Sequence, residues 1–308
     1  MRIVFFGNPD FCLHPLLSLY HSQHEIISVV TNTDSKSGRG LKLTSSFVKQ
    51  KALELSIPII ETNDVSSNKL FNQLSELNAD LFVVVAFSIL PDSIINIPKY
   101  GSINIHPSLL PKYRGSSPIQ YSLLNGDKET GVSIINLNSK VDSGAILGQK
   151  TILTPMDATF GDMYEKLGIL GSKLLMEVVD DIKNGNSNAI IQDESKKSLA
   201  PKIKKEQYKI NWLQESLSVY NQIRAFDPYP GAYAMLDGKR IKLFGAQKVQ
   251  DFQSVKSKVG QIIILDNNLI IKTNTEFISI SNVQLEGKKK VSSFDFIKTI
   301  VDKEYILE

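Results

Sequence analysis

The sequence predicts an α/β domain built on a Rossmann-like, mostly parallel sheet with helices on both faces, followed by a small OB-like β-barrel domain. Three observations lead to this fold class. Continuous apolar runs at residues 2–6 and 81–86 are typical of strands buried on both faces of a parallel sheet. Residues 159–183 carry apolar side chains at helical spacing, which predicts one long helix. After residue 210, short apolar segments alternate with turn residues, a pattern that favours a small barrel.

The remaining elements are expected to alternate between helices and strands in the first half of the chain. Helices are expected at residues 10–21, 46–56, 68–78 and 118–124, and strands at 25–31, 58–61, 102–106, 131–137 and 146–153. The second half is expected to hold a helix over 216–226, strands at 231–236, 240–244, 260–265, 269–272 and 277–283, and a last helix from about residue 293.

Length and composition predict where the domains divide. With 308 residues, the chain is long enough for two domains. Asn184-Gly185-Asn186 interrupts the long helical pattern, and residues 192–205 are polar and rich in lysine. We therefore predict a first domain over residues 1–186, a basic linker over 187–205 and a second domain over 206–308.

Composition also excludes several classes of protein. No apolar run approaches the ~20 residues of a membrane span, and the chain begins with a strand pattern rather than a signal peptide, so we expect a cytoplasmic protein. The single cysteine, Cys12, excludes an internal disulfide and a cysteine-based metal cluster. From Lys196 onward the chain holds 19 Lys+Arg against 12 Asp+Glu. This basic half suits a polyanion partner, although ordinary solvated lysines would give the same count.

The stretch from Ser102 to Gly115 carries the strongest sign of a functional site. Asn104 and His106 stand two residues apart on an expected strand, so their side chains point to the same face. Pro107 ends the strand because it has no amide proton for the ladder, which leaves both side chains at a strand end, where open α/β sheets bind ligands. Asp142, in the loop after the next strand, could reach one nitrogen of His106, favour the protonated ring and aim the other nitrogen at a substrate.

Each of these residues also has an ordinary structural interpretation. An asparagine at a strand end is often a turn former, a lone histidine often lies in the core or on the surface, and an aspartate before Ser-Gly often shapes a turn. The first strand is not followed by a G-x-G-x-x-G pattern, which argues against a dinucleotide site. From spacing alone, the functional and the structural interpretations both remain open.

Short motifs of a more specific kind run along nearly the whole chain. The central ones are Asn104-x-His106, residues 108–115, Pro118-Ile119-Gln120, Gly131-Val132 and Asp142-Ser143-Gly144. Together they resemble the motifs of the formyltetrahydrofolate-dependent formyltransferases. Four further stretches resemble the branch of that family that acts on a tRNA, namely residues 7–11, Gly38-Arg39-Gly40, Gln192-Asp193-Glu194 and residues 223–231.

The resemblance implies an activity and three catalytic residues. The formyl group of 10-formyltetrahydrofolate would pass to the amino group of methionine on initiator methionyl-tRNA, giving N-formylmethionyl-tRNA for translation initiation. Asn104 and a charged His106 would donate hydrogen bonds to the oxyanion, and Asp142 would hold His106 and help to deprotonate the amine. Neither a metal, nor a membrane, nor an obligate protein partner is implied.

The resemblance also implies two sets of binding residues. The folate would be bound by Phe87, Ile89, Leu90, Ser108, Leu109, Leu110, Pro111 and Asn138, on a 87–91 loop that is one residue shorter than the usual family pattern. The tRNA would be bound by Lys36, Arg39, Lys42, Lys204, Lys205, Lys288, Lys289 and Lys290. Lys112 or Arg114 could bind the charged tail of the folate, with solvated surface as the alternative.

Two rival functions remain open. A sibling enzyme that formylates a sugar amine or glycinamide ribonucleotide would share the central motif, but it would not need the Gly38-Arg39-Gly40 loop or a basic second domain. An RNA-binding module with a degenerate folate domain is a rival from another class. The presence of Asn104, His106 and Asp142 together weighs against that second rival.

Overall fold

The computed structural model describes residues 1–37, 42–249, 257–300 and 304–308, with the backbone alone at residues 36, 37 and 42. By packing, the chain divides into two units. The first comprises Met1–Ser116, Glu129–Ile152 and Tyr164–Ala200, and the second comprises Ser117–Lys128, Leu153–Met163 and Pro201–Glu308. The boundaries at residues 186 and 206 remain predictions, and packing puts residues 187–200 with the first unit.

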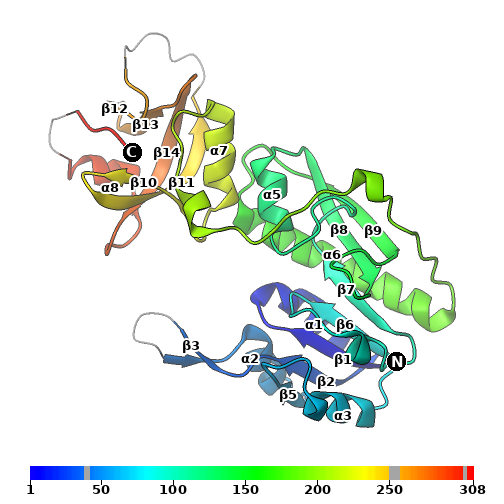
Figure 1. Ribbon diagram of the computed structural model, residues 1–308. Helices are drawn as coiled ribbons and strands as arrows, with labels where there is room; N and C mark the ends of the chain where they lie inside the picture. The colour runs from blue at the N-terminus through cyan, green and yellow to red at the C-terminus, as the bar shows by residue number, and fades with distance from the viewer. Residues whose placement is uncertain (38–41, 250–256, 301–303) are drawn as a thin grey trace. The chain divides into compact units, whose positions relative to one another are not determined.

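A seven-stranded sheet in the order β5-β2-β1-β6-β7-β8-β9 forms the centre of the first unit (Figure 1). The strands are β1 (Arg2–Gly7), β2 (Glu25–Thr31), β5 (Ile59–Glu61), β6 (Leu81–Val85), β7 (Ser102–His106), β8 (Glu129–Asn136) and β9 (Ile146–Leu153). The first five in that spatial order run parallel, and β8 pairs antiparallel with β7. The predicted mostly parallel sheet is therefore confirmed, and β6 is buried along its whole length because both of its faces are covered.

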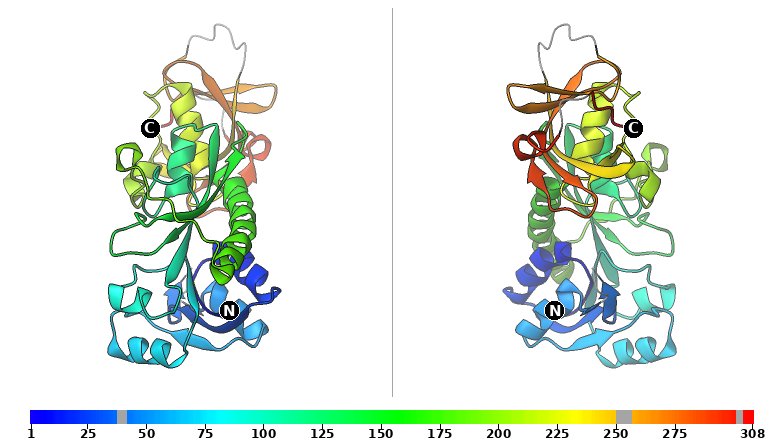
Figure 2. Two further views of the ribbon diagram at one scale, coloured as in Figure 1. Left: turned by 90° about the vertical axis from the view of Figure 1, so that its right-hand side faces the viewer. Right: turned by 90° about the vertical axis from the view of Figure 1, so that its left-hand side faces the viewer.

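Helices cover both faces of this sheet, as predicted (Figure 2). They are α1 (Leu13–Tyr20), which follows the 3-10 turn η1 (Asp10–Cys12), and α2 (Phe47–Glu54), α3 (Asn68–Glu76), α4 (Asp92–Ile95) and α6 (Phe160–Asn184). Side chains of α3 and α4 pack with Val4 and Phe6 in one core. On the opposite face, Gly171 of α6 lies so close to Ile105 that a Cβ there would come within 3.1 Å of it.

Local sequence signals explain where some of these elements begin. Ser46 and Ser67 each accept a hydrogen bond from a backbone N–H in the first turn of α2 and α3, so both helices begin close to the predicted residues. The helix α4 and the strands β3 and β4 were not predicted. α4 has only four residues, too few for a helical pattern, and the antiparallel pair of β3 (Ser35–Ser37) and β4 (Lys42–Thr44) is made of residues that resemble a polar loop.

The second unit is built on an antiparallel sheet in the order β10-β11-β14-β13-β12, with β15 beside β14. Its elements are α5 (Pro118–Leu124), the 3-10 turn η3 (Lys205–Tyr208), α7 (Ser216–Ala225), β10 (Ala232–Leu236), β11 (Lys239–Lys248), β12 (Ile262–Leu265), β13 (Asn268–Lys272), β14 (Phe277–Leu285), β15 (Val291–Ser292) and α8 (Ser293–Ile297). Asp237-Gly238 and Asp266-Asn267 adopt positive φ at both positions, which matches the two-residue turns of the hairpins β10–β11 and β12–β13.

Residues 305–308 close this sheet into a barrel. The Ile262 N–H donates to the Tyr305 carbonyl at 2.9 Å, and the Leu307 N–H donates to the Gly260 carbonyl at 2.8 Å, on the β12 side. On the β10 side, Met235 and Glu308 exchange two backbone hydrogen bonds of 2.7 and 3.0 Å. The segment therefore bridges the two edge strands, and the predicted small barrel is confirmed.

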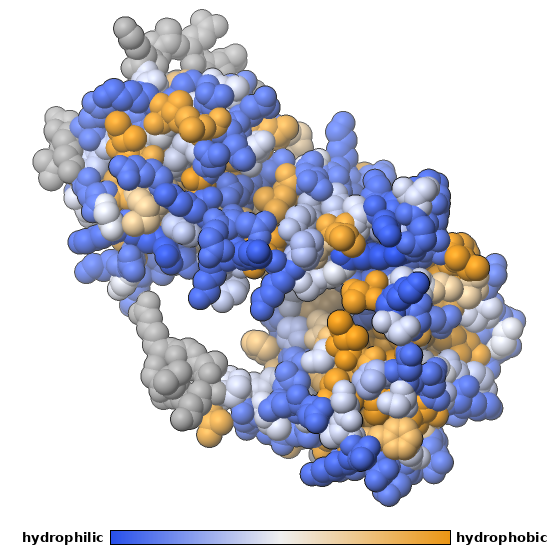
Figure 3. Space-filling view, viewed as in Figure 1, coloured by the Kyte–Doolittle hydropathy of each residue, from blue (hydrophilic) through white to orange (hydrophobic). Residues whose placement is uncertain are grey.

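The surface in the view of Figure 3 is mostly hydrophilic, with apolar side chains gathered in patches on both units. Ile89 and Val141 are among the exposed apolar side chains of the first unit, at 69% and 51% exposure. Within the described parts of the chain, no helix combines the length and the apolar character that a membrane span requires.

Candidate active site

A pocket in the first unit gathers several of the predicted site residues. Its walls come from the end of β6, from the loop after it, from β7 and from the loop after β8. The lining residues are Val84, Phe87, Ser88, Ile89, Leu90, Ile95, Asn104, Leu137, Asn138, Lys140, Val141 and Asp142. Apolar walls around a few polar groups are typical of a small-molecule site. The structure thus brings Asn104 and Asp142 together with Phe87, Ile89, Leu90 and Asn138.

Asn104 offers a free carboxamide to this pocket. It is the half-buried residue in the middle of β7, between the buried Ile103 and Ile105, because alternate side chains of a strand point to opposite faces. No side-chain hydrogen bond joins Asn104 to another residue in the described ranges. Both amide hydrogens are therefore available to a ligand.

His106 lies deeper than Asn104, with 4% of its surface exposed. Its Nε2 lies 2.9 Å from the Tyr113 carbonyl, and since a carbonyl only accepts, Nε2 carries a proton. Nδ1 lies 3.6 Å from Asp142 Oδ2, which is longer than a hydrogen bond but within the range of an ion pair. The predicted orientation, in which the nitrogen that faces away from Asp142 points at the substrate, is wrong because that nitrogen donates to the Tyr113 carbonyl.

The Asp142 loop has a tightly defined shape. Asp142 adopts a left-handed φ of 49°, and its Oδ2 accepts a hydrogen bond from the Gly115 N–H at 2.8 Å. Gly144 must be a glycine here, because a Cβ would lie 1.7 Å from the Asn136 carbonyl oxygen. Asn138 accepts bonds from the Lys140 N–H and the Ser143 hydroxyl, both at 3.0 Å, so its carboxamide oxygen shapes the loop.

The predicted folate residues 108–111 lie elsewhere. None of them lines the pocket, and Ser108 is fully buried, with its hydroxyl donating to the Lys112 carbonyl at 2.7 Å. Ser133 on β8 binds both the Ser108 carbonyl and the Leu110 N–H. In this structure the 108–111 segment packs against β8, and its folate role stays a prediction.

Two further residues of the quoted motifs, Arg114 and Gln192, lie buried and bind each other. Arg114 is 7% exposed, and its Nη2 donates to Gln192 Oε1 at 2.8 Å and to Glu194 Oε1 at 2.7 Å. That bond holds the pKa of the Glu194 carboxyl below its ordinary value. Arg114 is therefore committed inside the protein rather than free for the tail of the folate. Gln192 was noticed only as part of a motif, and its pairing with Arg114 has no sequence signal of its own.

The predicted tRNA contacts are only partly described. Arg39 lies outside the described residues, and Lys36 and Lys42 stand on β3 and β4 with their side chains undescribed. Lys204 and Lys205 are exposed where η3 begins. Lys288, Lys289 and Lys290 are exposed in the loop after β14, and the Lys290 ammonium lies 4.0 Å from the centre of the Phe244 ring. The five lysines of the second unit are accessible to a polyanion, and the tRNA-binding role of the whole set stays a prediction.

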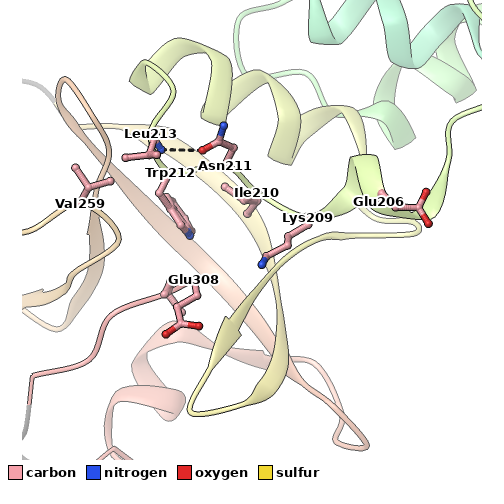
Figure 4. Close-up of a pocket in the computed structure, with 9 residues that line it drawn as sticks. Glu206, Lys209, Ile210, Asn211, Trp212, Leu213, Val259 and Glu308 are labelled. Atoms are coloured by element: carbon pink, nitrogen blue, oxygen red, sulfur yellow. Dashed lines mark hydrogen bonds between the residues drawn. The ribbon is translucent and has the colours of Figure 1, made fainter.

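A second pocket lies in the second unit, beside the segment that closes the barrel (Figure 4). Its walls include Lys209, Trp212 and Glu308, and the Leu213 N–H donates to the Asn211 side chain at 3.1 Å. Trp212 lines this pocket and is 5% exposed. No predicted site residue lines this pocket, so we assign it to the packing of the barrel.

Comparison with known proteins covers both parts of the chain. The formyl transferase family profile matches residues 1–179, and the profile of the formyl transferase C-terminal domain matches residues 202–300. The chain is 37% identical to a methionyl-tRNA formyltransferase of Geobacter metallireducens, over 96% of this chain and 95% of that protein. It is 35% identical to a methionyl-tRNA formyltransferase of Staphylococcus aureus, over 99% of both chains.

Solved structures share the fold at lower identity. An N-formyltransferase from Helicobacter canadensis, in complex with folinic acid and dTDP-3-aminofucose, has a TM-score of 0.68 at 19% identity and covers 94% of this chain and 100% of its own. HypX from Aquifex aeolicus in complex with tetrahydrofolic acid has a TM-score of 0.65 at 19% identity, and the match covers 96% of this chain and 47% of HypX. Since both parts of the chain match and the relatives align from end to end, this chain belongs to the formyl transferase family.

Proposed function

We propose that this protein transfers the formyl group of 10-formyltetrahydrofolate to the amino group of methionine on initiator methionyl-tRNA. The observation that carries the proposal is the free carboxamide of Asn104 in an apolar pocket beside Asp142 and His106. The full-length likeness to methionyl-tRNA formyltransferases supports the choice of acceptor.

The reaction is an acyl transfer between two nitrogens. The amine forms a bond to the formyl carbon, the bond from that carbon to the folate nitrogen breaks, and a proton passes from the amine to the leaving nitrogen. Negative charge develops on the formyl oxygen as the amine attacks. Asn104 donates its amide hydrogens to this oxygen, which is the contact of an oxyanion hole.

Asp142 and His106 take part in the transfer of the amine proton. Asp142 lines the pocket, so its carboxylate can take the proton from the attacking amine directly or through a water. The nearby His106 ring donates from Nε2 to the Tyr113 carbonyl, which fixes its orientation and turns Nδ1 towards the carboxylate. A proton on Nδ1 then stabilises the charge of Asp142 across the 3.6 Å between them.

The pocket walls suit a flat folate. Phe87, Leu90 and Leu137 supply apolar surface, and Ile89 at 69% exposure stands where a bound ring would cover it. The cations of the second unit and of the early loop, Arg39 among them, would bind the phosphates of the tRNA. No residue of the described site requires a metal for this chemistry.

The test is a formylation assay with labelled 10-formyltetrahydrofolate and charged initiator tRNA. The wild-type protein is expected to formylate the methionine and to leave a nucleotide-linked amino sugar unmodified. Asn104→Ala is expected to lower kcat by ~10²–10³, the usual effect of removing an oxyanion donor, while the affinity for folate changes little. Formylation of the sugar instead of the tRNA, or a near-normal kcat in Asn104→Ala, would contradict the proposal.

A further inference from the structure

An ordered segment of the first unit, residues 190–200, joins the two loops that surround His106. We call it the strap. Ile190 exchanges two backbone hydrogen bonds of 2.8 Å with Ile146, where the strap begins. At the other end, the Arg114 N–H donates to the Ser198 carbonyl at 2.9 Å and the Ala200 N–H donates to the Arg114 carbonyl at 2.7 Å. The strap thus runs from the loop that carries Asp142 to the loop that carries Tyr113.

Tyr113 and Asp142 contact the two edges of the His106 ring, and both adopt a left-handed backbone. Their φ values are 63° and 49°, a region that costs free energy for residues other than glycine. A strap side chain binds each of them. The Tyr113 N–H donates to Ser198 Oγ at 2.9 Å, and Gln192 Nε2 donates to the Asp142 carbonyl at 2.8 Å.

Gln192 is the most completely bonded member of the strap. Its Nε2 also donates to the Gly144 carbonyl at 2.8 Å, and its Oε1 accepts from Arg114 Nε at 3.0 Å and from Arg114 Nη2 at 2.8 Å. At 6% exposure it has little access to water that could replace these bonds. One side chain therefore fixes the backbone on both sides of Ser143 and ties it to the residue that follows Tyr113.

We propose that Gln192 is a positioning residue that holds Asp142 in its place relative to His106 and the pocket. The inference rests on the proposed function, because it assigns Gln192 a part in that same site. Gln192 does not line the pocket, so it acts through Asp142 rather than on the substrate. Its role is separate from that of Asn104, which stands on a strand that the strap does not hold.

Gln192→Glu tests this with minimal change in shape. The carboxylate can still accept from Arg114, but an oxygen replaces the nitrogen that faces the Asp142 and Gly144 carbonyls, and oxygen repels oxygen there. The Asp142 loop is expected to move, and a displacement of about 1 Å at a reacting group can lower the rate ~10²-fold. We expect kcat to fall by about 10- to 100-fold while the dissociation constant for folate changes less than about threefold.

Gln222→Glu is the matched control. Gln222 Nε2 also donates to two backbone carbonyls, those of Gln207 at 2.8 Å and Lys209 at 3.0 Å, but all three residues belong to the second unit. The same substitution therefore breaks the same kind of bonds without touching Asp142. This variant is expected to keep a kcat within about twofold of the wild type.

Ring-nitrogen NMR of His106 provides a readout that does not depend on catalysis. The signal of Nδ1 is expected to shift in Gln192→Glu and to stay unchanged in Gln222→Glu, because only the first moves the carboxylate that faces it. If Gln192→Glu does not fold, Gln192→Met, which has the same length and no donor, is judged by the same criteria. Suppose that the wild type formylates the tRNA, and that the Gln192 variant keeps a normal kcat and an unshifted His106 signal. That result would overturn this inference and leave the proposed function intact. Absence of wild-type formylation would instead overturn the proposed function.

Discussion

Ser133 offers a sharp test of how the structure holds the loop after β7. The residue is fully buried on β8, and its hydroxyl donates to the Ser108 carbonyl at 2.7 Å. The same oxygen accepts from the Leu110 N–H at 3.1 Å and from Gln149 Nε2 at 2.8 Å. Ser133→Ala removes all three bonds.

The loss can be estimated from the groups left behind. The Ser108 carbonyl and the Leu110 N–H become buried and unpaired, and each such group costs about 1–3 kcal/mol. Gln149 adds little, because its amide still donates to the Leu110 carbonyl at 3.0 Å. We therefore expect the free energy of unfolding to fall by about 2–6 kcal/mol, which corresponds to a decrease in Tm of roughly 4–24 °C for a unit of this size.

Thermal and urea unfolding of Ser133→Ala beside the wild type measure this loss. Ser75→Ala is the control, since Ser75 is only half-buried on α3 and its hydroxyl donates to the Phe71 carbonyl within the same helix. The control is expected to change the unfolding free energy by less than about 0.5 kcal/mol. A loss below about 1 kcal/mol in Ser133→Ala would show that the segment 108–111 is not held by this hydroxyl, and the argument that it packs against β8 would fail.

Three further outcomes are expected. Arg39→Ala lowers kcat/KM for charged initiator tRNA by roughly 10- to 100-fold with folate affinity unchanged. Arg39→Lys recovers little, because lysine cannot form the two parallel bonds of a guanidinium. Normal formylation by Arg39→Ala would mean that its loop does not bind the tRNA. Replacing Lys288, Lys289 and Lys290 by alanine flattens the dependence of tRNA affinity on salt, measured by filter binding at several salt concentrations, since each phosphate contact adds about 0.7–0.9 to the slope. Burial lowers the pKa of His24 below its ordinary value of 6.5. The unfolded chain therefore binds a proton more readily than the folded protein does, and the free energy of unfolding falls as the pH drops below 6.5. In His24→Gln the loss of stability between about pH 7 and pH 5 is smaller, and an unchanged pH profile in urea unfolding would count against this assignment.

The sequence predicts the parts of the site that depend on local pattern. A continuous apolar run gives β6, and alternation along residues 102–106 puts Asn104 on a face where the pocket lies. Asp142 follows the next strand in the chain, β8, which pairs with β7, and the loop after β8 brings Asp142 to 3.6 Å from His106. These features need only the period of a strand and the short connections between neighbouring strands.

Contacts between distant parts of the chain could not be predicted from the local sequence pattern. Residues 192–200 are polar and lysine-rich, so they resemble a linker, yet Gln192 is buried because its amide binds two carbonyls of the Asp142 loop. The bridging of β12 and β10 by residues 305–308 is likewise a matter of tertiary pairing. Neither contact leaves a periodic pattern in the sequence, because each joins residues that are far apart along the chain.

The orientation of His106 shows how such a distant contact reaches the chemistry. A motif of asparagine and histidine two residues apart specifies which side chains share an edge, but it does not specify which ring nitrogen faces which partner. That choice is made by the Tyr113 carbonyl, which accepts from Nε2, and Tyr113 adopts a left-handed φ of 63°. The Tyr113 N–H is in turn bound by the hydroxyl of Ser198, which lies 85 residues along the chain. The residues that share this strand can therefore be predicted from a short motif, whereas the ring nitrogen of His106 that faces Asp142 depends on a segment that the motif does not contain.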